Sequence, residues 1–154
     1  MIAIVQRVSE AKVTVDGRTV SEIGGGLAVL LGVADGDTDH DARLLADKIA
    51  KLRIFSDEND KLNLSVTDVG GSVLVVSNFT LLASYRKGNR PDYLKAAAPD
   101  EANRLYLLFA SYMRESVGDV QTGEFGAHMA FSLVNDGPIT IPMDSNVLKQ
   151  PKNA

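Results

Sequence analysis

The stretch GGGLAVLLGV, residues 24–33, gives the clearest indication of the fold. Three glycines are followed by an apolar run of Leu, Val and Ala, which is typical of a strand buried inside a sheet. The glycines do not make a phosphate-binding loop, because the Gly-Lys-Ser/Thr ending of that motif is missing and a strand follows where the motif requires a helix. We therefore expect residues 24–33 to form a buried strand of the core.

Two more strands are expected before this one. Residues 2–8, IAIVQRV, are apolar and rich in β-branched side chains, which predicts a strand. In residues 11–20, AKVTVDGRTV, Val13 and Val15 alternate with polar residues, and the Asp-Gly pair that follows them is a signal for a short hairpin turn. The chain therefore opens with consecutive strands.

Two helices are expected further along. Residues 37–55 and residues 100–118 both repeat apolar side chains at helical spacing, and Gly118 is suited to end the second helix. The candidate N-cap residues are Asp37, Thr38 or Asp39 for the first helix and Asp100 for the second. Each helix follows a group of strands, which disfavours a doubly wound sheet with alternating strands and helices.

The order of these elements predicts a single layered domain. About seven strands and two main helices indicate an α/β or α+β architecture. We place the domain at residues 1–145 and expect residues 146–154 to form a loosely ordered C-terminal tail. A length of 154 residues agrees with one domain.

The composition restricts the class of function. The chain has no cysteine, so neither disulfides nor thiolate metal sites are available, and it has no apolar stretch long enough to span a membrane. Its net charge of −4 argues against nonspecific coating of nucleic acid, including DNA, but leaves room for a small basic patch that holds one RNA end. We expect a cytoplasmic protein.

Side-chain catalysis has little support in the sequence. Thr80, in the segment SNFTL at residues 77–81, is a candidate nucleophile, but a threonine hydroxyl needs an activating base. The chain has only two histidines, His40 and His128, and they lack the spacing of metal ligands. A Thr-His triad and a metal site are therefore both weakly supported.

The segment VNDGPIT, residues 134–140, lies between two predicted strands and admits two interpretations. Asn, Asp, Gly and Pro together are typical of a hairpin turn. Alternatively, the absence of a Cβ at Gly137 lets a ligand approach the backbone, and Pro138 makes a cis peptide accessible, so that carbonyl groups could bind an ammonium group. The residues alone leave both interpretations open.

Over nearly its whole length, the sequence resembles the D-aminoacyl-tRNA deacylases, also called D-tyrosyl-tRNA deacylases. The two signature motifs of that family are S-Q-x-T-[LM] and N-x-G-P-x-T. The second is intact at residues 135–140, whereas the first has Asn78 in place of Gln. The other segments that carry the resemblance are QRVSEAKVTVDG, GGGLAVLLGV, ADKIAKLRIFSDEN, KLNLSVTDVGGSVLVVSNFTL, KGNRPDY, TGEFGAHM and LVNDGPITI.

The resemblance implies a fold and an activity. The fold would be an α/β domain with a mixed, mostly antiparallel, barrel-like sheet. The activity would be hydrolysis of the ester that joins a D-amino acid, or glycine, to tRNA, without a cofactor or a metal. The enzyme would be a homodimer in which Gly137 and Pro138 enter the partner's site and exclude L-side chains, while Arg7 orients their carbonyl groups. A noncatalytic dimeric module that binds RNA 3′ ends or small amines is the alternative.

The resemblance also assigns roles to the remaining candidate residues. Main-chain N–H groups near Ser77 to Phe79 would stabilise the developing oxyanion, with Thr80 lining the pocket and positioning the ester. The expected catalytic segment consists of Ser77, Asn78, Phe79 and Thr80. Phe125 and Met129 are expected to wall the adenosine or amino-acid pocket, with ordinary core packing as the alternative for each. The expected tRNA contacts are Arg86, Lys87 and Arg90.

Overall fold

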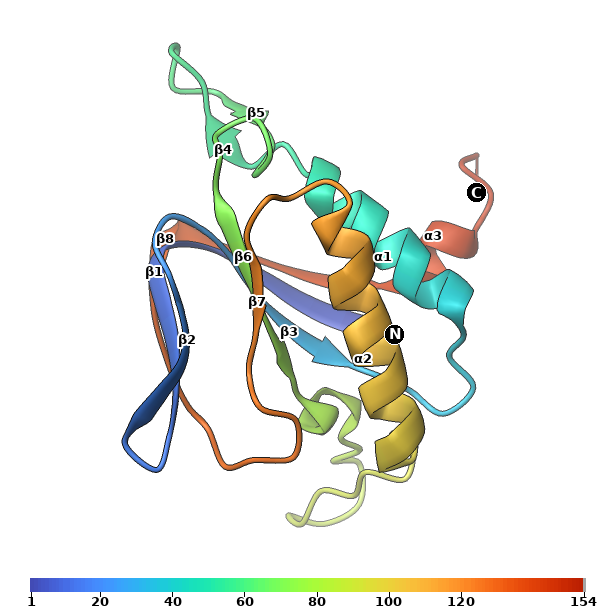
Figure 1. Ribbon diagram of the computed structural model, residues 1–154. Helices are drawn as coiled ribbons and strands as arrows, with labels where there is room; N and C mark the ends of the chain where they lie inside the picture. Colours follow the sequence, from blue (N-terminus) through green and yellow to red (C-terminus); the bar gives the residue numbers. More distant parts are fainter. Residues whose placement is uncertain (154) are drawn as a thin grey trace.

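The computed structural model describes residues 1–153 and is organised around one long strand, β1 (Ile2–Val15). β1 pairs antiparallel with β2 (Arg18–Ile23), with β3 (Gly26–Gly32) and with β8 (Ala130–Asp144). Its first half lies beside β3 and its second half beside β2, and β8 follows its other edge along nearly the whole length. The strongly curved sheet that results is drawn in Figure 1.

The sheet continues beyond β3 with parallel strands. β6 (Ser72–Ser77) pairs parallel with β3, and β7 (Val120–Thr122) pairs parallel with β6. The strand order β2-β1-β3-β6-β7, with β8 on β1, gives a nearly closed, barrel-like mixed sheet. The barrel-like mixed sheet that the family resemblance implied is thereby confirmed.

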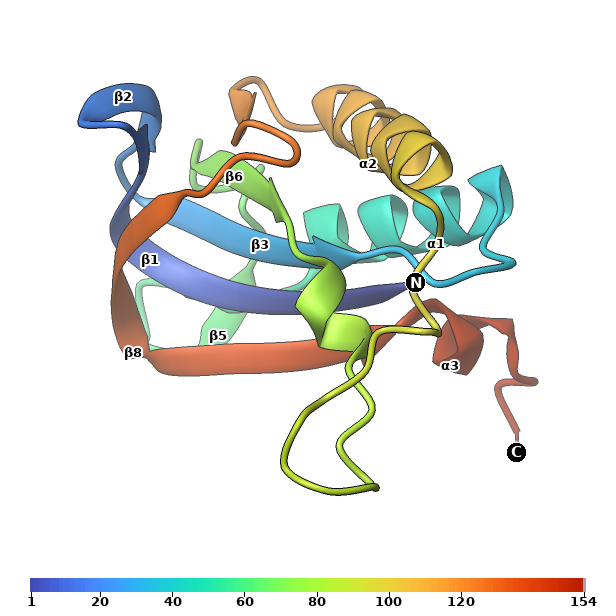
Figure 2. The ribbon, with the colours of Figure 1, turned by 90° about the horizontal axis from the view of Figure 1, so that it is seen from below.

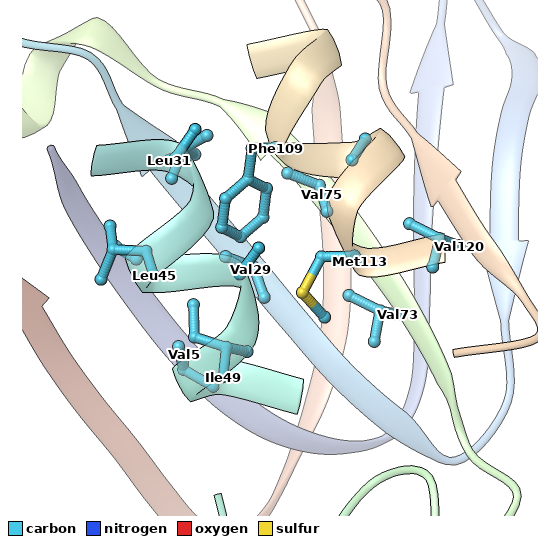
Figure 3. Close-up of a cluster of buried hydrophobic side chains, with 14 of the residues drawn as sticks. Val5, Val29, Leu31, Leu45, Ile49, Val73, Val75, Phe109, Met113 and Val120 are labelled. Carbon is cyan, nitrogen blue, oxygen red and sulfur yellow. The ribbon is translucent and has the colours of Figure 1, made fainter. Parts of the chain in front are cut away.

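Two helices cover one face of this sheet. α1 (Asp39–Lys51) and α2 (Pro99–Arg114) lie side by side across it, as Figures 1 and 2 show. Figure 3 shows Phe109 and Met113 of α2 close to Val29 and Val75 of the sheet, and Leu45 of α1 belongs to the same cluster. All of these side chains are fully buried, so the main core lies between the helices and the sheet.

A second apolar cluster lies on the opposite face of the sheet. Ala28 and Leu74 belong to it, whereas their neighbours along the strands, Val29 and Val75, belong to the first. β3 and β6 are therefore buried on both faces, which explains why their sequences are apolar without alternation. The cluster consists of Val8, Ala11, Val13, Val15, Ile23, Ala28, Leu74 and Val76.

The smaller elements lie at the edges. β4 (Phe55–Ser56) and β5 (Leu62–Leu64) form a separate hairpin, and the 3₁₀ helix η1 (Phe79–Leu82) follows β6. The segment after residue 145 begins with a short helix, α3 (Ser145–Lys149), which contacts α1. The domain boundary at residue 145 stays a prediction. No helix within residues 1–153 is long and apolar enough to cross a membrane.

The structure corrects several expected element boundaries. No hairpin turn forms at residues 134–140, because β8 runs through them as one strand, and register shifts around Val8 absorb the irregularity. α2 begins at Pro99, with Ala98 as N-cap, because proline fits the first helical position where no N–H bond is needed. Asp100 is therefore inside the first turn and does not cap the helix.

The first helix is shorter than its apolar pattern suggested. Its N-cap is Thr38, one of the expected candidates, whose backbone N–H donates to the Asp41 carboxylate at 2.9 Å. The helix ends at Lys51, and the chain leaves it at Leu52 with extended ψ. α2 likewise ends at Arg114, before the glycine that we expected to end it.

Candidate functional site

A cavity of about 950 Å³ opens where β6 ends. Its wall combines the strand end and η1 with the start of α2 and the segment 125–131, which are far apart in sequence. Figure 2 shows η1 beside the chain that leads into α2. The lining residues are Leu30, Val33, Val76, Ser77, Asn78, Phe79, Thr80, Tyr93, Ala96, Ala97, Ala98, Pro99, Ala102, Phe125, Gly126, Ala127, His128, Met129 and Phe131.

Backbone contacts fix the segment that follows β6. The Asn78 N–H donates to the Leu31 carbonyl at 2.8 Å, which extends the pairing with β3 by one residue. η1 then packs on the end of β3 at Gly32, where a Cβ would lie 2.6 Å from Leu82 Cδ2 and 3.1 Å from the Asn78 carbonyl oxygen. Only a residue without a side chain leaves room for this close approach.

Asn78 holds Thr80 through its side chain. Asn78 Oδ1 accepts a hydrogen bond from the Thr80 N–H at 3.3 Å and another from the Thr80 hydroxyl. In residues 1–153, no hydrogen bond joins the Thr80 hydroxyl to a histidine or a carboxylate. The base that a nucleophilic Thr80 would need is therefore missing from its immediate surroundings.

Aromatic side chains line two sides of the cavity. Phe79 and Tyr93 meet edge to face, with ring centroids 5.0 Å apart, and they stay 55% and 37% exposed. Phe125 also lines the cavity, and its ring centroid lies 6.0 Å from that of Tyr106, whose buried hydroxyl donates to the Val75 carbonyl at 3.1 Å. Burial raises the pKa of Tyr106 above its ordinary value, so this hydroxyl stays neutral.

Met129 also lies on the wall, and its neighbour Gly123 leaves it space. A Cβ at Gly123 would lie 2.7 Å from Met129 Sδ. The structure thus brings Phe125 and Met129 to the same cavity as the segment 77–80. The mixture of flat aromatic faces and a thioether suits a ligand that is partly apolar.

The segment 134–140 is held by its own polar groups. Asn135 Oδ1 accepts from the Ile139 N–H at 3.0 Å, and Asn135 Nδ2 donates to Thr140 Oγ1 at 2.7 Å. Between them, the Gly137–Pro138 peptide is cis and both residues are exposed. None of residues 134–140 lines the cavity in this chain.

Arg7 contacts this segment one residue earlier than the resemblance implied. Its Nε donates to the Asp136 carbonyl at 3.0 Å and lies 3.5 Å from the Asp136 carboxylate. Its Nη1 donates to the Ile54 carbonyl at 2.9 Å. Arg7 therefore ties the residue before Gly137 to the main body of the domain.

The three basic candidates lie on an exposed loop. Backbone bonds in both directions between Ser84 and Asp92 close this loop, and Tyr93 of the cavity follows directly. Arg86, Lys87 and Arg90 are exposed, and within residues 1–153 they form no ion pair. Their charges are therefore available to an anionic partner beside the cavity.

Sequence analysis assigns no role to two parts of the cavity wall. Tyr93 was not singled out, although an aromatic residue within a polar, charged loop is a signal that could have identified it. The turn from Ala96 to Pro99 carries no such signal, because small residues have no chemistry of their own. His128 lines the cavity, whereas His40 is in the first turn of α1 and does not. Residues 1–153 contain no cluster of His, Cys, Asp and Glu arranged for a metal ion.

Comparison with known proteins identifies the family. A family model described as D-Tyr-tRNA(Tyr) deacylase matches residues 4–144. A D-aminoacyl-tRNA deacylase of Dehalococcoides mccartyi is 55% identical over 152 residues, covering 99% of both chains. One of Anaeromyxobacter dehalogenans is 57% identical over 148 residues, covering 96% of this chain and 99% of the relative.

Solved structures agree with this assignment. A c-Myc DNA unwinding element binding protein superposes with a TM-score of 0.88 and 40% identity, covering 94% of this chain and 98% of its own. A probable eukaryotic D-amino acid tRNA deacylase has a TM-score of 0.79 at 19% identity, covering 93% and 98%, which supports the fold alone. The family model and the relatives cover nearly the whole chain at high identity, and on these grounds the protein belongs to the D-Tyr-tRNA(Tyr) deacylase family.

Proposed function

We propose that this protein hydrolyses the ester bond of D-aminoacyl-tRNA and so releases the D-amino acid and the tRNA in the cytoplasm. The cavity at the end of β6 is the observation that carries the proposal, because it is large enough for an aminoacylated nucleoside and has aromatic walls for it. The names of the relatives, which are D-aminoacyl-tRNA deacylases, support the same activity.

The hydrogen bonds of the segment 77–80 narrow the choice of oxyanion donor. The N–H of Asn78 is bound to Leu31, and the N–H of Thr80 is bound to the Asn78 side chain. Phe79 is the first residue of η1, and the N–H of a first helical residue has no acceptor within its helix. We therefore assign the Phe79 N–H as the main-chain donor to the carbonyl oxygen of the ester.

The reaction needs little further chemistry. A water oxygen attacks the ester carbon, the bond to the ribose oxygen breaks, and that oxygen takes a proton as tRNA leaves. An aminoacyl ester is already activated, so holding it in position and stabilising the oxyanion supply much of the rate. The neighbouring ribose 2′-hydroxyl is suited to assist the water.

The oxyanion assignment can be tested by removing one N–H group. We expect Phe79→Pro to lower the single-turnover rate by about 100-fold, because loss of one oxyanion donor costs roughly that much. Phe79→Ala is the matched control, since it removes the same ring but keeps the N–H. Proline is tolerated at the first position of a helix. Equal rates for the two variants would contradict the assignment.

We further propose that a second copy of the chain completes the site. The exposed Gly137–Pro138 segment lies outside its own cavity, yet Asn135 and Arg7 hold the residues around it. In a homodimer this backbone would face the partner's cavity, where its carbonyl groups would bind the α-ammonium group. An L-side chain would then collide with backbone, whereas D-amino acids and glycine would fit.

A site shared between two subunits predicts the activity of mixed dimers. Homodimers of Phe79→Pro and of Gly137→Val should both be impaired. A mixed dimer pairs the intact cavity of one subunit with the intact Gly137 of the other, so it should recover about half of the wild-type rate. A mixed dimer as impaired as its parents would show that both elements act within one chain. Native mass should correspond to twice 16.5 kDa.

The exposed basic loop would contact the tRNA. Replacing Arg86, Lys87 and Arg90 together by glutamine should raise KM at physiological salt. It should also reduce the slope of log KM against log salt concentration by up to about 3, because each phosphate contact contributes about one to that slope. The rate at saturating substrate should stay unchanged. The matched control is Arg18→Gln, an exposed arginine that pairs with Glu124 on a different loop. An unchanged salt slope would remove the loop from the tRNA interface.

The overall function is tested by comparing D-tyrosyl-tRNA with L-tyrosyl-tRNA and glycyl-tRNA, with and without EDTA. We expect hydrolysis of the D-ester and of the glycyl ester that persists in EDTA, and little hydrolysis of the L-ester. A noncatalytic nucleic-acid binding module is the second candidate, favoured by the printed name of one structural relative, a DNA unwinding element binding protein. Tight binding of tRNA without turnover of any ester would support that alternative.

A further inference from the structure

The side chain of Asn78 binds Thr80, and this contact has no part in the steps of the proposed reaction. Its Oδ1 atom faces both the N–H and the hydroxyl of Thr80, at the start of η1 and on the wall of the cavity. A backbone N–H is always a donor, so the atom facing it must be the amide oxygen and not the amide nitrogen. This fixes the orientation of the Asn78 side chain.

The direction of the second hydrogen bond follows from the first. A carboxamide oxygen accepts hydrogen bonds and cannot donate them, so the Thr80 hydroxyl must donate its single proton to Asn78 Oδ1. What Thr80 Oγ1 still offers is its lone pairs. Thr80 is exposed and lines the cavity, so those lone pairs are accessible to a ligand.

We propose that Asn78 is a positioning residue that turns the Thr80 hydroxyl into a fixed hydrogen-bond acceptor for the aminoacyl end of tRNA. The inference rests on the proposed function. In this arrangement Thr80 does not donate to the ester carbonyl and does not attack it. It accepts a hydrogen bond from a donor group of the bound substrate, and the two such groups next to the ester are the α-ammonium and the ribose 2′-hydroxyl.

The length of the side chain at position 78 is important for this role. Asn and Asp close a short ring with the backbone two residues ahead, which is why they are preferred as helix N-caps. Glutamine has one more methylene group, and its oxygen does not reach the same point without a change in backbone. Asn78→Asp keeps the acceptor in place, Asn78→Gln displaces it, and Asn78→Ala removes it.

A double-mutant cycle tests whether Asn78 acts through Thr80. Asn78→Ala should lower kcat/KM for D-tyrosyl-tRNA by about fivefold to tenfold, the effect of one hydrogen bond. In a Thr80→Val background, which lacks the hydroxyl, the same substitution should change kcat/KM by less than about twofold. Asn78→Asp should restore most of the activity. Asn63→Ala, on the distant β4–β5 hairpin, is the matched control and should have no effect.

A substrate that lacks the ribose 2′-hydroxyl shows which of its groups donates the hydrogen bond to Thr80. On tRNA ending in 2′-deoxyadenosine, the effect of Asn78→Ala disappears if the 2′-hydroxyl is the donor and remains if the α-ammonium is. Either result supports an acceptor at Thr80. Equal losses from Asn78→Ala with and without the Thr80 hydroxyl would overturn the proposal, because Asn78 would then act independently of it.

A measurement without substrate separates this inference from the proposed function. By NMR, the Thr80 amide proton should exchange more slowly with solvent in the wild type and in Asn78→Asp than in Asn78→Ala and Asn78→Gln. Equal exchange in all four proteins would overturn the positioning role even in an active enzyme. A wild-type protein that hydrolyses no D-aminoacyl-tRNA would instead refute the proposed function.

Discussion

The buried carboxylate of Asp41 joins both ends of the chain to α1, and its loss should be costly. It accepts hydrogen bonds from the hydroxyl of Ser145 at 2.6 Å and from the N–H of Thr38 at 2.9 Å, and it forms an ion pair with Lys149. The Ser145 hydroxyl also accepts from the α-ammonium group of Met1 at 2.9 Å. Asp41 and Ser145 are 1% and 0% exposed. Asp41→Asn therefore disturbs a buried network.

The size of the effect can be worked out from these contacts. An asparagine oxygen can keep either the bond from Ser145 or the bonds from the N–H and hydroxyl of Thr38, but the NH₂ group then faces the other donor. Loss of one bond to a charged group costs about 1.5–3 kcal/mol, and the mismatch adds about 1 kcal/mol. The ion pair adds little because Lys149 is 40% exposed. We expect a loss of about 3 kcal/mol, which lowers Tm by roughly 10 °C in a protein of this size.

The pH dependence supplies a second check. Burial alone would raise the pKa of Asp41, but hydrogen bonds from Lys149, Ser145 and Thr38 outweigh it and hold the pKa well below its ordinary value. A depressed pKa contributes stability that is present above the unfolded-state pKa of about 3.9 and is lost as the pH falls. The gap in unfolding free energy between wild type and Asp41→Asn should be constant from pH 8 to pH 5 and should narrow below pH 4.

Urea unfolding at several pH values measures this gap. Asp47→Asn is the matched control, because Asp47 is on the same helix, is half-exposed and, among residues 1–153, forms an ion pair with Arg43 alone. It should change the unfolding free energy by less than about 0.5 kcal/mol. An Asp41→Asn protein as stable as the control, or a gap that stays the same down to pH 3, would refute the reasoning about the buried network.

Two further substitutions test the sheet and the site. Gly26→Ala would place a Cβ 1.8 Å from the Ser72 carbonyl oxygen and force β3 and β6 apart. We expect the free energy of unfolding, measured in urea, to fall by about 3 kcal/mol or more. A wild-type unfolding midpoint would contradict the close packing of these strands. Thr80→Ala should keep the single-turnover rate within about tenfold of wild type, because it removes one hydrogen bond and not a nucleophile. Complete loss of turnover with unchanged substrate affinity would restore a nucleophilic role for Thr80.

The sequence predicts the core strands well because an uninterrupted apolar run indicates a strand that is buried on both faces. The apolar runs of β3 and β6 show no alternation, and the structure buries both faces of both strands. The helices were located by their periodicity, but their ends depend on local capping. Pro99 at the first position of α2 is a signal that sequence analysis can use, and it should have outweighed Asp100 as the start of the helix.

The path of β8 could not be obtained from local sequence. Asn, Asp, Gly and Pro favour a turn, and the preference is overruled by pairing with β1 on both sides of the segment 134–140. Residues of β1 and β8 that pair are more than 110 positions apart, so no local pattern reports on them. The same limit applies to the cavity, since its walls come from segments around Phe79, Tyr93 and Phe125 that only the fold brings together.

The position of the site follows from the mixed topology. β6 is parallel to its neighbours, so its carboxyl end is free of a hairpin and leads directly into η1. Gly32 lets that turn pack against β3, and the Asn78 N–H adds one more bond to it. The direction of the Phe79 N–H is therefore set by the same contacts that stabilise the sheet. As the oxyanion donor that we propose, this N–H would need no reorganisation when charge develops on the ester, which is the condition under which a backbone can replace catalytic side chains.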